Sequence, residues 1–352
     1  AQIFERHGLH QARRFGAAPT SLRIAKLVSD RGDFDPIAVA AELRSTGSIL
    51  AAIPNYLLDL SITIPNDPYA LPEQWYVQSP ADGDVDLPEA WDVERGDSSV
   101  VIGIADTGID LGHPDLAAKI WTNPDEIPGN SLDDDGNGYV DDVHGWDFGN
   151  HDNDPNPHPV FDPVVEIDVG FHGTFVAGIA AAATNNSVGI AGASWRSKLM
   201  PLKIVNQAGE ITSESLAEAF LYATVEEADI LNVSLGSAFE PGLPEFFQQL
   251  VDTADSAGVV CVSAAGNDAD SASVYPAAND KVIAVAATDQ NNLRTSFSNW
   301  GPWIDIAAPG TQMWSSICRN YVFDETSDIY YVFLFGWDGV NPYMYGDGTS
   351  FA

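Results

Sequence analysis

From residue 98 onward, short apolar runs alternate with stretches that have helical spacing. The run from Val100 to Ala105 is continuously apolar and bounded by polar residues, which is typical of a strand buried on both faces. Further strands are expected at 199–205, 229–235, 259–264 and 281–287, and helices at 173–183, 213–228 and 244–257. This alternation predicts an α/β fold, a doubly wound parallel sheet with helices on both faces. Sites in such sheets form at the carboxyl ends of the strands.

The first sixty or so residues differ from the rest of the chain. They hold much of the basic charge, a helical stretch at 36–44 and a strand-like run at 49–64, and a segment rich in Pro and Asp follows. We therefore expect a small α+β segment at 1–64, a linker and the start of the main region at 65–97, and the main domain at 98–352.

The charge balance limits the choice of partners. The chain carries 15 basic and 51 acidic residues, a net charge of −36, so its field would repel a phosphate backbone and nucleic acid is not expected as a partner. No segment approaches the run of about 20 apolar residues that spans a bilayer, and no membrane partner is expected. Cys261 lies in an apolar run and is interpreted as a buried small hydrophobe. Cys318 is far from it in sequence, so no disulfide framework is predicted.

Three sequence islands could together carry nucleophilic catalysis. Asp106 ends the strand-like run and is followed by Thr-Gly, His172 precedes Gly-Thr at the start of a helix of small residues, and Ser350 follows Gly-Thr. A hydroxyl nucleophile needs an adjacent base, and the base needs a third group that fixes its tautomer. Each island alone has an ordinary structural explanation, but their order, glycines and structural context agree.

These motifs resemble the three signatures of the subtilase family, in the order Asp, His, Ser. The resemblance covers about residues 69–352 and implies a secreted, calcium-stabilised serine endopeptidase that acts on polypeptides through an acyl-enzyme. It also implies that Asp106 orients His172 as the base for Ser350. The segment 263–267 is similar to the one that carries the family's oxyanion-hole asparagine, which places that role on Asn267.

The resemblance also implies a substrate-binding region. The segment from residue 233 resembles one side of the primary specificity pocket, and 203–210 resembles the edge that pairs with an extended substrate. The residues expected to bind substrate are Ser234, Leu235, Gly236, Gly209 and Gly266. A strand followed by a loop would explain both segments equally well. Three positions depart from the family pattern. Phe171 precedes the histidine where a small residue is usual, Phe175 stands where a second histidine is common, and Phe351 replaces the usual Met after the serine. A ring at 171 could crowd the cleft.

The acidic run from Asp133 repeats the first half of an EF-hand loop. Oxygen-bearing residues alternate and a glycine occupies the sixth position, an arrangement that suits calcium, although the glutamate expected at the twelfth position is missing. The expected ligands are Asp133, Asp135, Asn137, Tyr139 and Asp142. A solvated acidic turn is the alternative.

A second calcium site is implied by the resemblance alone. The loop 184–190 is similar to the one that forms the family's strong calcium site, with Asp115 as an added carboxylate and Gln74 as a weaker candidate. The expected ligands are Asp115, Thr184, Asn186, Val188 and Ile190.

The two ends of the chain carry further expectations. Residues 1–64 resemble the end of a subtilase propeptide, which would make the chain's own propeptide a partner, and a small fused binding module is the rival interpretation. In subtilases the serine opens a long buried helix, so we expect the natural protein to continue beyond Ala352 and the chain as given to have little activity. The alternative function is a catalytically inactive, calcium-dependent binding scaffold of subtilase type.

Overall fold

The computed structural model describes residues 2–15, 24–31, 35–46, 52, 62–162, 167–236, 240–319, 336 and 340–352. The chain divides into two compact units, Ala1–Ser61 and Ile62–Ala352. No helix within these described ranges has both the length and the apolar character needed to cross a membrane.

The described residues of the smaller unit contain two helices and a pair of antiparallel strands. Helix α1 (Gln2–Arg6) precedes the antiparallel strands β1 (Leu9–Phe15) and β2 (Ile24–Ser29), and helix α2 (Pro36–Ser45) follows. Its small apolar core is formed by Leu9, Val39 and Leu43. Helix α2 confirms the helix expected at 36–44, whereas most of the strand-like run 49–64 lies outside the described residues.

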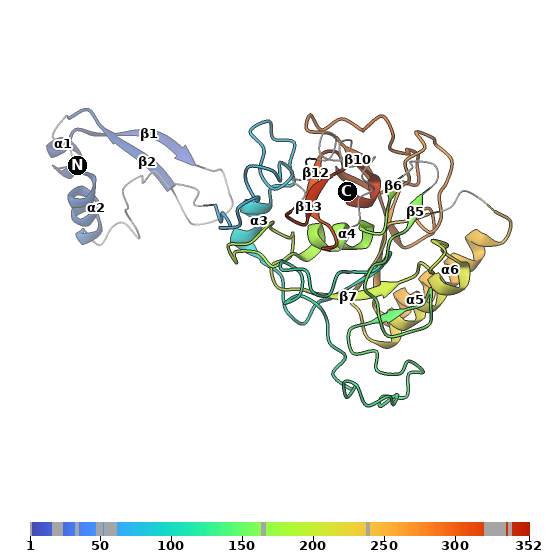
Figure 1. Cartoon of the computed structure of the whole chain (residues 1–352). Coiled ribbons are helices and arrows are strands. Elements are labelled where there is room, and N and C mark those ends of the chain that lie inside the picture. The colour runs from blue at the N-terminus through green and yellow to red at the C-terminus, as the bar shows by residue number, and fades with distance from the viewer. Residues whose placement is uncertain are drawn as a thin grey trace. The chain divides into compact units, whose positions relative to one another are not determined.

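The larger unit is built on a seven-stranded sheet in the order β11-β10-β9-β8-β3-β7-β4. Strands β7 and β10 of this sheet are labelled in Figure 1. Every pairing in this sheet is parallel, which confirms the predicted fold class. Its strands are β3 (Val101–Asp106), β4 (Trp146–Asp147), β7 (Lys198–Lys203), β8 (Ile230–Val233), β9 (Val260–Ala264), β10 (Val282–Thr288) and β11 (Ile306–Pro309).

Helices cover both faces of this sheet. Because successive side chains of a strand point to opposite faces, Ile102 and Ile104 of β3 pack in one apolar cluster, together with helix α4 (His172–Ala181). Ala105 packs in the other, together with helices α5 (Ser213–Val225) and α6 (Leu243–Ala257). A capping box at Thr212 begins α5, and a left-handed Gly258 (φ +94°) ends α6.

Shorter elements complete the larger unit. They are helix α3 (Leu87–Val93), the antiparallel pairs β5 (Phe161–Asp162) with β6 (Ile167–Asp168) and β12 (Met313–Ser316) with β13 (Tyr343–Gly346), and the 3-10 helix η1 (Thr349–Phe351). Helix α4 lies close against β12. The approach is so tight that a Cβ at Gly178 would come within 2.3 Å of the Ser316 Oγ.

The segment 65–97, expected as a linker and the start of the main region, is an integral part of the larger unit. Ala70, Tyr76, Val77 and Trp91 are buried in its core. Both cysteines are free, and Cys261 is buried as predicted.

Candidate functional site

Asp106 and His172 form a closely bonded pair between the sheet and helix α4. Asp106 is the last residue of β3 and His172 the first of α4, and the Nδ1 of His172 lies 2.8 and 2.9 Å from the two carboxylate oxygens. Thr107 joins the two segments as well. Its hydroxyl donates to the carbonyl of Gly170 and accepts from the N–H of Gly173, both at 2.9 Å. The strand end and the helix start are therefore fixed to each other.

The Asp106 carboxylate controls the protonation of the imidazole. Because Nδ1 faces a carboxylate, it carries the ring proton of the neutral form, and Nε2 is left with a lone pair. Burial by itself lowers the pKa of His172, but the negative charge of Asp106 and the hydrogen bond to it outweigh this effect. The pKa of His172 consequently lies above its ordinary value of 6.5. The pair has the geometry of an oriented general base.

Ser350 lies in η1 beside this pair. The ring of the next residue, Phe351, lies 5.2 Å from the imidazole between centroids. The Ser350 hydroxyl donates to the carbonyl of Ser234 at 3.0 Å, and the Ser234 hydroxyl donates to the carbonyl of Ser350 at 3.1 Å. The residue after the serine thus lies against the imidazole, while the serine hydroxyl is bonded to Ser234 and not to His172.

Asn267 supports the turn that carries the serine. Its Oδ1 accepts hydrogen bonds from the N–H and the hydroxyl of Thr349 at 2.9 and 3.0 Å. The N–H of Gly266 donates to the same hydroxyl at 3.0 Å. Because Asn267 is exposed and its oxygen is engaged, its amide nitrogen is left as the group that can donate to a substrate oxygen.

Two of the expected substrate-binding residues, Ser234 and Gly266, are hydrogen-bonded to the serine turn. The segment Ser234–Gly236 follows β8, and a Cβ at Gly236 would meet the Val274 side chain at 2.4 Å. Gly209 is different. It forms a turn between β7 and α5, with φ +82°, and its N–H donates to the carbonyl of Asn206.

The phenylalanines on either side of the His172 motif, at positions 171 and 175, pack inward. Phe171 and Phe175 are both buried, and their ring centroids lie 6.0 Å apart. Phe175 also packs against Phe351 at 4.2 Å. The ring at 171 belongs to the same apolar core cluster as residues of helix α4.

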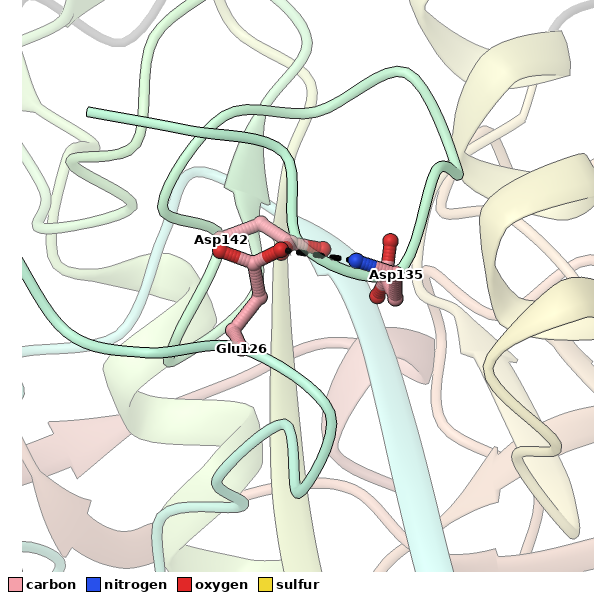
Figure 2. Close-up of side chains that lie close together, drawn as sticks. All are labelled: Glu126, Asp135 and Asp142. Atoms are coloured by element: carbon pink, nitrogen blue, oxygen red, sulfur yellow. Dashed lines mark hydrogen bonds between the residues drawn. The ribbon is translucent and has the colours of Figure 1, made fainter. Parts of the chain in front are cut away.

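The acidic loop gathers three carboxylates in a candidate cation site (Figure 2). Ligand oxygens of Glu126, Asp135 and Asp142 all lie within 4.8 Å of one another. Asn137 donates to both aspartates, at 3.1 and 2.9 Å. The Oε2 of Glu126 is buried and has no hydrogen-bond partner. An orphaned buried carboxylate oxygen beside two further carboxylates fits a hard cation such as calcium.

The other expected ligands of this loop have local roles in the structure. The Asp133 carboxylate accepts from the N–H groups of Gly136 and Gly138, at 2.7 and 3.0 Å. The Tyr139 ring packs against Trp146, Phe148 and Tyr222. Glu126 could not be predicted from the sequence, because it precedes the EF-hand-like motif and carries no spacing signal.

A second acidic pair lies at the loop 184–190. Asp115 accepts from the Asn186 amide and the Ile190 N–H, at 2.9 and 2.8 Å. Asp67, also missed in the sequence, accepts from the N–H groups of Asn185 and Asn186. Burial raises the pKa of Asp115 to about 6, and the charge of Asp67 adds to the effect.

The remaining expected ligands of this loop are bonded within it or to its neighbours. The Thr184 hydroxyl bonds to backbone groups of its own loop, and the Val188 N–H bonds to the Asn186 side chain. The Gln74 side-chain Oε1 accepts from the N–H of Ala191 at 2.7 Å. Two buried carboxylates without a basic partner among the described residues fit a cation here too.

Comparison with known proteins gives consistent matches to serine proteases. A thermophilic serine proteinase of Bacillus sp. strain AK1 is 34% identical over 88% of this chain and 64% of its own length. Thermitase of Thermoactinomyces vulgaris is 37% identical over 72% of this chain and 75% of its own length. A solved protease structure from Pseudoalteromonas arctica superimposes with a TM-score of 0.63 at 29% identity, covering 82% of this chain and 84% of that one.

The family match covers most of the larger unit. The chain spans about two thirds of the length of the Bacillus relative and 41% of a halolysin from Haloferax mediterranei. The family model described as the subtilase family matches residues 97–352. This region holds the paired Asp106 and His172, the serine turn, the cluster of three carboxylates and Asp115, but not Asp67. The chain belongs to the subtilase family.

Proposed function

We propose that this protein is a serine endopeptidase that hydrolyses peptide bonds through Asp106, His172 and Ser350. The observation that carries the proposal is the two-oxygen contact of Asp106 with the Nδ1 of His172, beside the 3-10 helix that holds Ser350. Membership of a family whose named relatives are serine proteinases supports it.

In this mechanism His172 Nε2 removes the proton of Ser350 as the serine oxygen attacks the substrate carbonyl. Asp106 holds the ring in the required tautomer and stabilises its protonated form. The amide nitrogen of Asn267 and the N–H of Ser350 would bind the oxyanion. Protonated His172 then gives this proton to the leaving amine as the C–N bond breaks, which leaves the acyl-enzyme. Water attacks the acyl-enzyme with the neutral His172 again acting as the base, and cleavage of the ester bond releases the acid product and restores the serine.

The serine hydroxyl must turn before it can react. It donates to the carbonyl of Ser234 at 3.0 Å, so rotation about its Cα–Cβ bond is required to bring it to His172. The segment Ser234–Gly236, with Gly266 and Gly209, is proposed to bind the substrate chain. The same Ser350–Ser234 contact favours a second candidate function, an inactive calcium-dependent scaffold.

We also propose that calcium stabilises the fold. Glu126, Asp135 and Asp142 would hold one ion, with Asp133 and the Tyr139 carbonyl bordering the loop. Asn137 directs its amide nitrogen to both aspartates, so it would add an oxygen to the ion only after its amide group turns over. Asp67 and Asp115 would hold a second ion, with Thr184, Asn186, Val188 and Ile190 supplying oxygens. Calcium at these sites would supply charge neutralisation and rigidity, and no step of peptide hydrolysis passes through it.

Residues 1–64 are proposed to be the end of the protein's own propeptide. The proposed substrates are polypeptides. We also propose that the protein is secreted, which the name of a related extracellular protease of Xanthomonas campestris supports.

Covalent labelling tests the enzyme proposal against the scaffold alternative. The full-length protein should react with a fluorophosphonate and hydrolyse casein, and Ser350→Ala should do neither. Ser256→Ala, at an exposed position of α6, keeps the reactive hydroxyl and serves as the matched control. A folded wild-type protein that the reagent leaves unmodified would establish the scaffold instead.

A further inference from the structure

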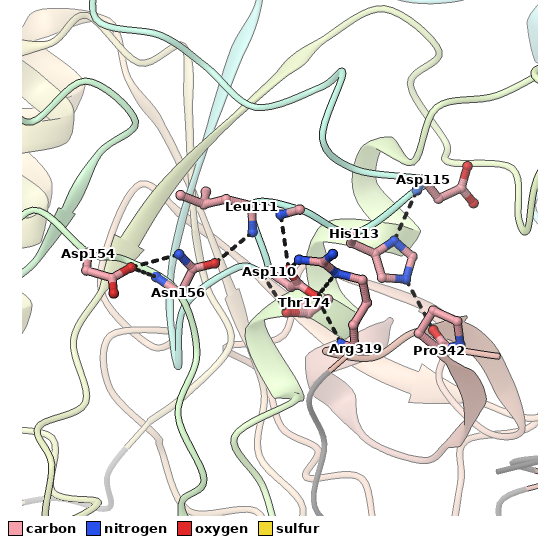
Figure 3. A network of polar contacts seen from close by, with 10 residues as sticks. Asp110, Leu111, His113, Asp115, Asp154, Asn156, Thr174, Arg319 and Pro342 are labelled. Carbon is pink, nitrogen blue, oxygen red and sulfur yellow. Dashed lines mark hydrogen bonds and ion pairs between the residues drawn. The ribbon is translucent and has the colours of Figure 1, made fainter. Parts of the chain in front are cut away.

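A buried carboxylate lies four residues beyond Asp106 and is held by an arginine from another part of the chain (Figure 3). Asp110 Oδ2 accepts from the Arg319 N–H and Nε, and Oδ1 accepts from Nη2, all at 2.9 Å. The Asp110 side chain is 7% exposed and that of Arg319 47%. Two of these contacts form the paired geometry that only arginine can make with a carboxylate.

The same aspartate is bonded to the helix that begins with His172. The N–H of Asp110 donates to the Thr174 hydroxyl at 3.0 Å. Two further hydroxyls bond the first turn of α4 to β12, because Ser316 and Ser315 donate to the carbonyls of Thr174 and Phe175, at 2.9 and 2.7 Å.

These contacts form a closed chain of connections between the segments that carry Asp106 and His172. The connections run from the Asp110 loop to Thr174 of the helix, from Thr174 to Ser316 of β12, and along the chain to Arg319, which returns to Asp110. Neither Asp110 nor Arg319 is bonded to Asp106 or His172. The connections nevertheless include both segments that set the distance between those two side chains, namely the loop after β3 and the first turn of α4.

The local sequence fits this role for the arginine. A Cβ at Gly112 would lie 2.1 Å from the Arg319 Nη2, so the guanidinium lies directly over the backbone of the loop that follows Asp110. Asp110 Oδ1 also accepts from the N–H of Gly112 at 3.0 Å. Loss of the guanidinium would leave a buried carboxylate without its charged partner, and the loop would have to rearrange to hydrate it.

We propose that Asp110 and Arg319 are positioning residues that hold the loop after Asp106 against the helix of His172. The inference rests on the proposed function. The Asp110–Arg319 ion pair is inferred to affect the reaction rate through the geometry of the Asp106–His172 hydrogen bond, and not only through the stability of the folded protein.

The test compares Arg319→Ala and Arg319→Lys with wild type in the full-length protein. Because misplacement of about 1 Å far from the chemistry can cost about 100-fold in rate, loss of one of several connections should lower kcat by about 10-fold. The KM should stay within about two-fold, since no substrate contact is removed. The low-field proton resonance of His172 Nδ1–H should shift in the alanine variant. Lysine should restore part of kcat, because it keeps the charge without the paired contact.

A matched control separates positioning from stability. Arg95 also binds a backbone carbonyl of the core and lies over the Trp195 ring at 4.8 Å, away from the pair. Arg95→Ala should lower the melting temperature and leave kcat and the His172 resonance unchanged.

Clear outcomes would overturn the proposal. An Arg319→Ala protein with wild-type kcat and an unchanged His172 resonance would overturn it, whatever its melting temperature. Where the alanine variant does not fold, wild-type kcat in Arg319→Lys would overturn it instead. Failure of the wild-type protein to react with a fluorophosphonate would refute the proposed function, while the His172 resonance would still report on the ion pair.

Discussion

Replacement of Glu126 with glutamine should change stability in opposite directions with and without calcium. With the ion removed, Glu126 and Asp142 are two buried carboxylates whose oxygens lie within 4.8 Å of each other. Glutamine removes one of these charges and can keep the Oε1 contact with the N–H of Asp134 at 2.7 Å. Its new N–H₂ group can donate to a neighbouring carboxylate. With calcium bound, the same change removes a charged ligand.

The size of the stability gain expected in EDTA follows from the distance between the two carboxylates. Two unit charges 4.8 Å apart repel by about 3 kcal/mol at an effective dielectric constant of 20. Because Asp135 is exposed, its contribution is screened by water and is not counted. In EDTA the variant should therefore gain up to about 3 kcal/mol in free energy of unfolding. At about 2 °C per kcal/mol for a unit of this size, the melting temperature should rise by a few degrees. A ligand at 100 times its Kd stabilises by about 2.7 kcal/mol, and most of this gain should be lost in the variant.

Thermal unfolding in EDTA and in millimolar calcium gives the four melting temperatures required. Glu240→Gln is the matched control, because it removes one negative charge from an exposed position outside the cluster. It should leave both melting temperatures near those of wild type. Equal calcium gains in Glu126→Gln and wild type, or a lower melting temperature of the variant in EDTA, would refute the reasoning.

Three further predictions follow from buried contacts of the larger unit. Because Asp106 raises the pKa of His172 and the neutral ring is the base, kcat/KM should fall on acidification with a midpoint above 6.5. An Asp106→Asn variant should lower that midpoint, and an unchanged pH profile would contradict the assignment. Lys203 Nζ lies 2.6 Å from Asp147 in a buried pair, so Lys203→Met should cost about 3–5 kcal/mol in urea unfolding, and Lys203→Met with Asp147→Asn should recover part of it. Phe175 is fully buried, so Phe175→Ala should cost about 3–5 kcal/mol in the same assay, and a loss below 1 kcal/mol would show that the core collapses into the space.

The main sheet could be predicted because its strands are buried on both faces. The run 100–105 became β3 at Val101–Asp106, and the helix expected at 244–257 became α6 at Leu243–Ala257. Such elements carry their signal locally, in continuous apolar runs and helical spacing. The pair β12 and β13 carried no such signal. Each strand has four residues, and their pairing joins Met313 to Gly346 across a long connection, so only the folded chain reveals it.

The candidate site was predictable only where a motif marks it. Asp106, His172 and Ser350 lie in short glycine-flanked motifs, and the first two are in hydrogen-bond contact as that prediction requires. The serine hydroxyl's contact with Ser234 could not be predicted, because it depends on a side-chain rotation. Glu126 and Asp67 were also missed, since each reaches its acidic partner through tertiary contacts alone.

The buried carboxylates of this chain differ in whether they have a basic partner, a difference that the net charge of −36 does not show. Near the proposed catalytic residues, each buried carboxylate has a basic partner: Asp106 has His172 and Asp110 has Arg319. Away from them, carboxylates such as Asp142 are buried with other acids and, among the described residues, have only tyrosine, asparagine and backbone donors. Because a buried charge without a counter-charge is costly, such acidic clusters require either protonation or a cation. The positions that lack a basic partner are therefore those where calcium removal should destabilise the fold, and those with one should be insensitive to EDTA.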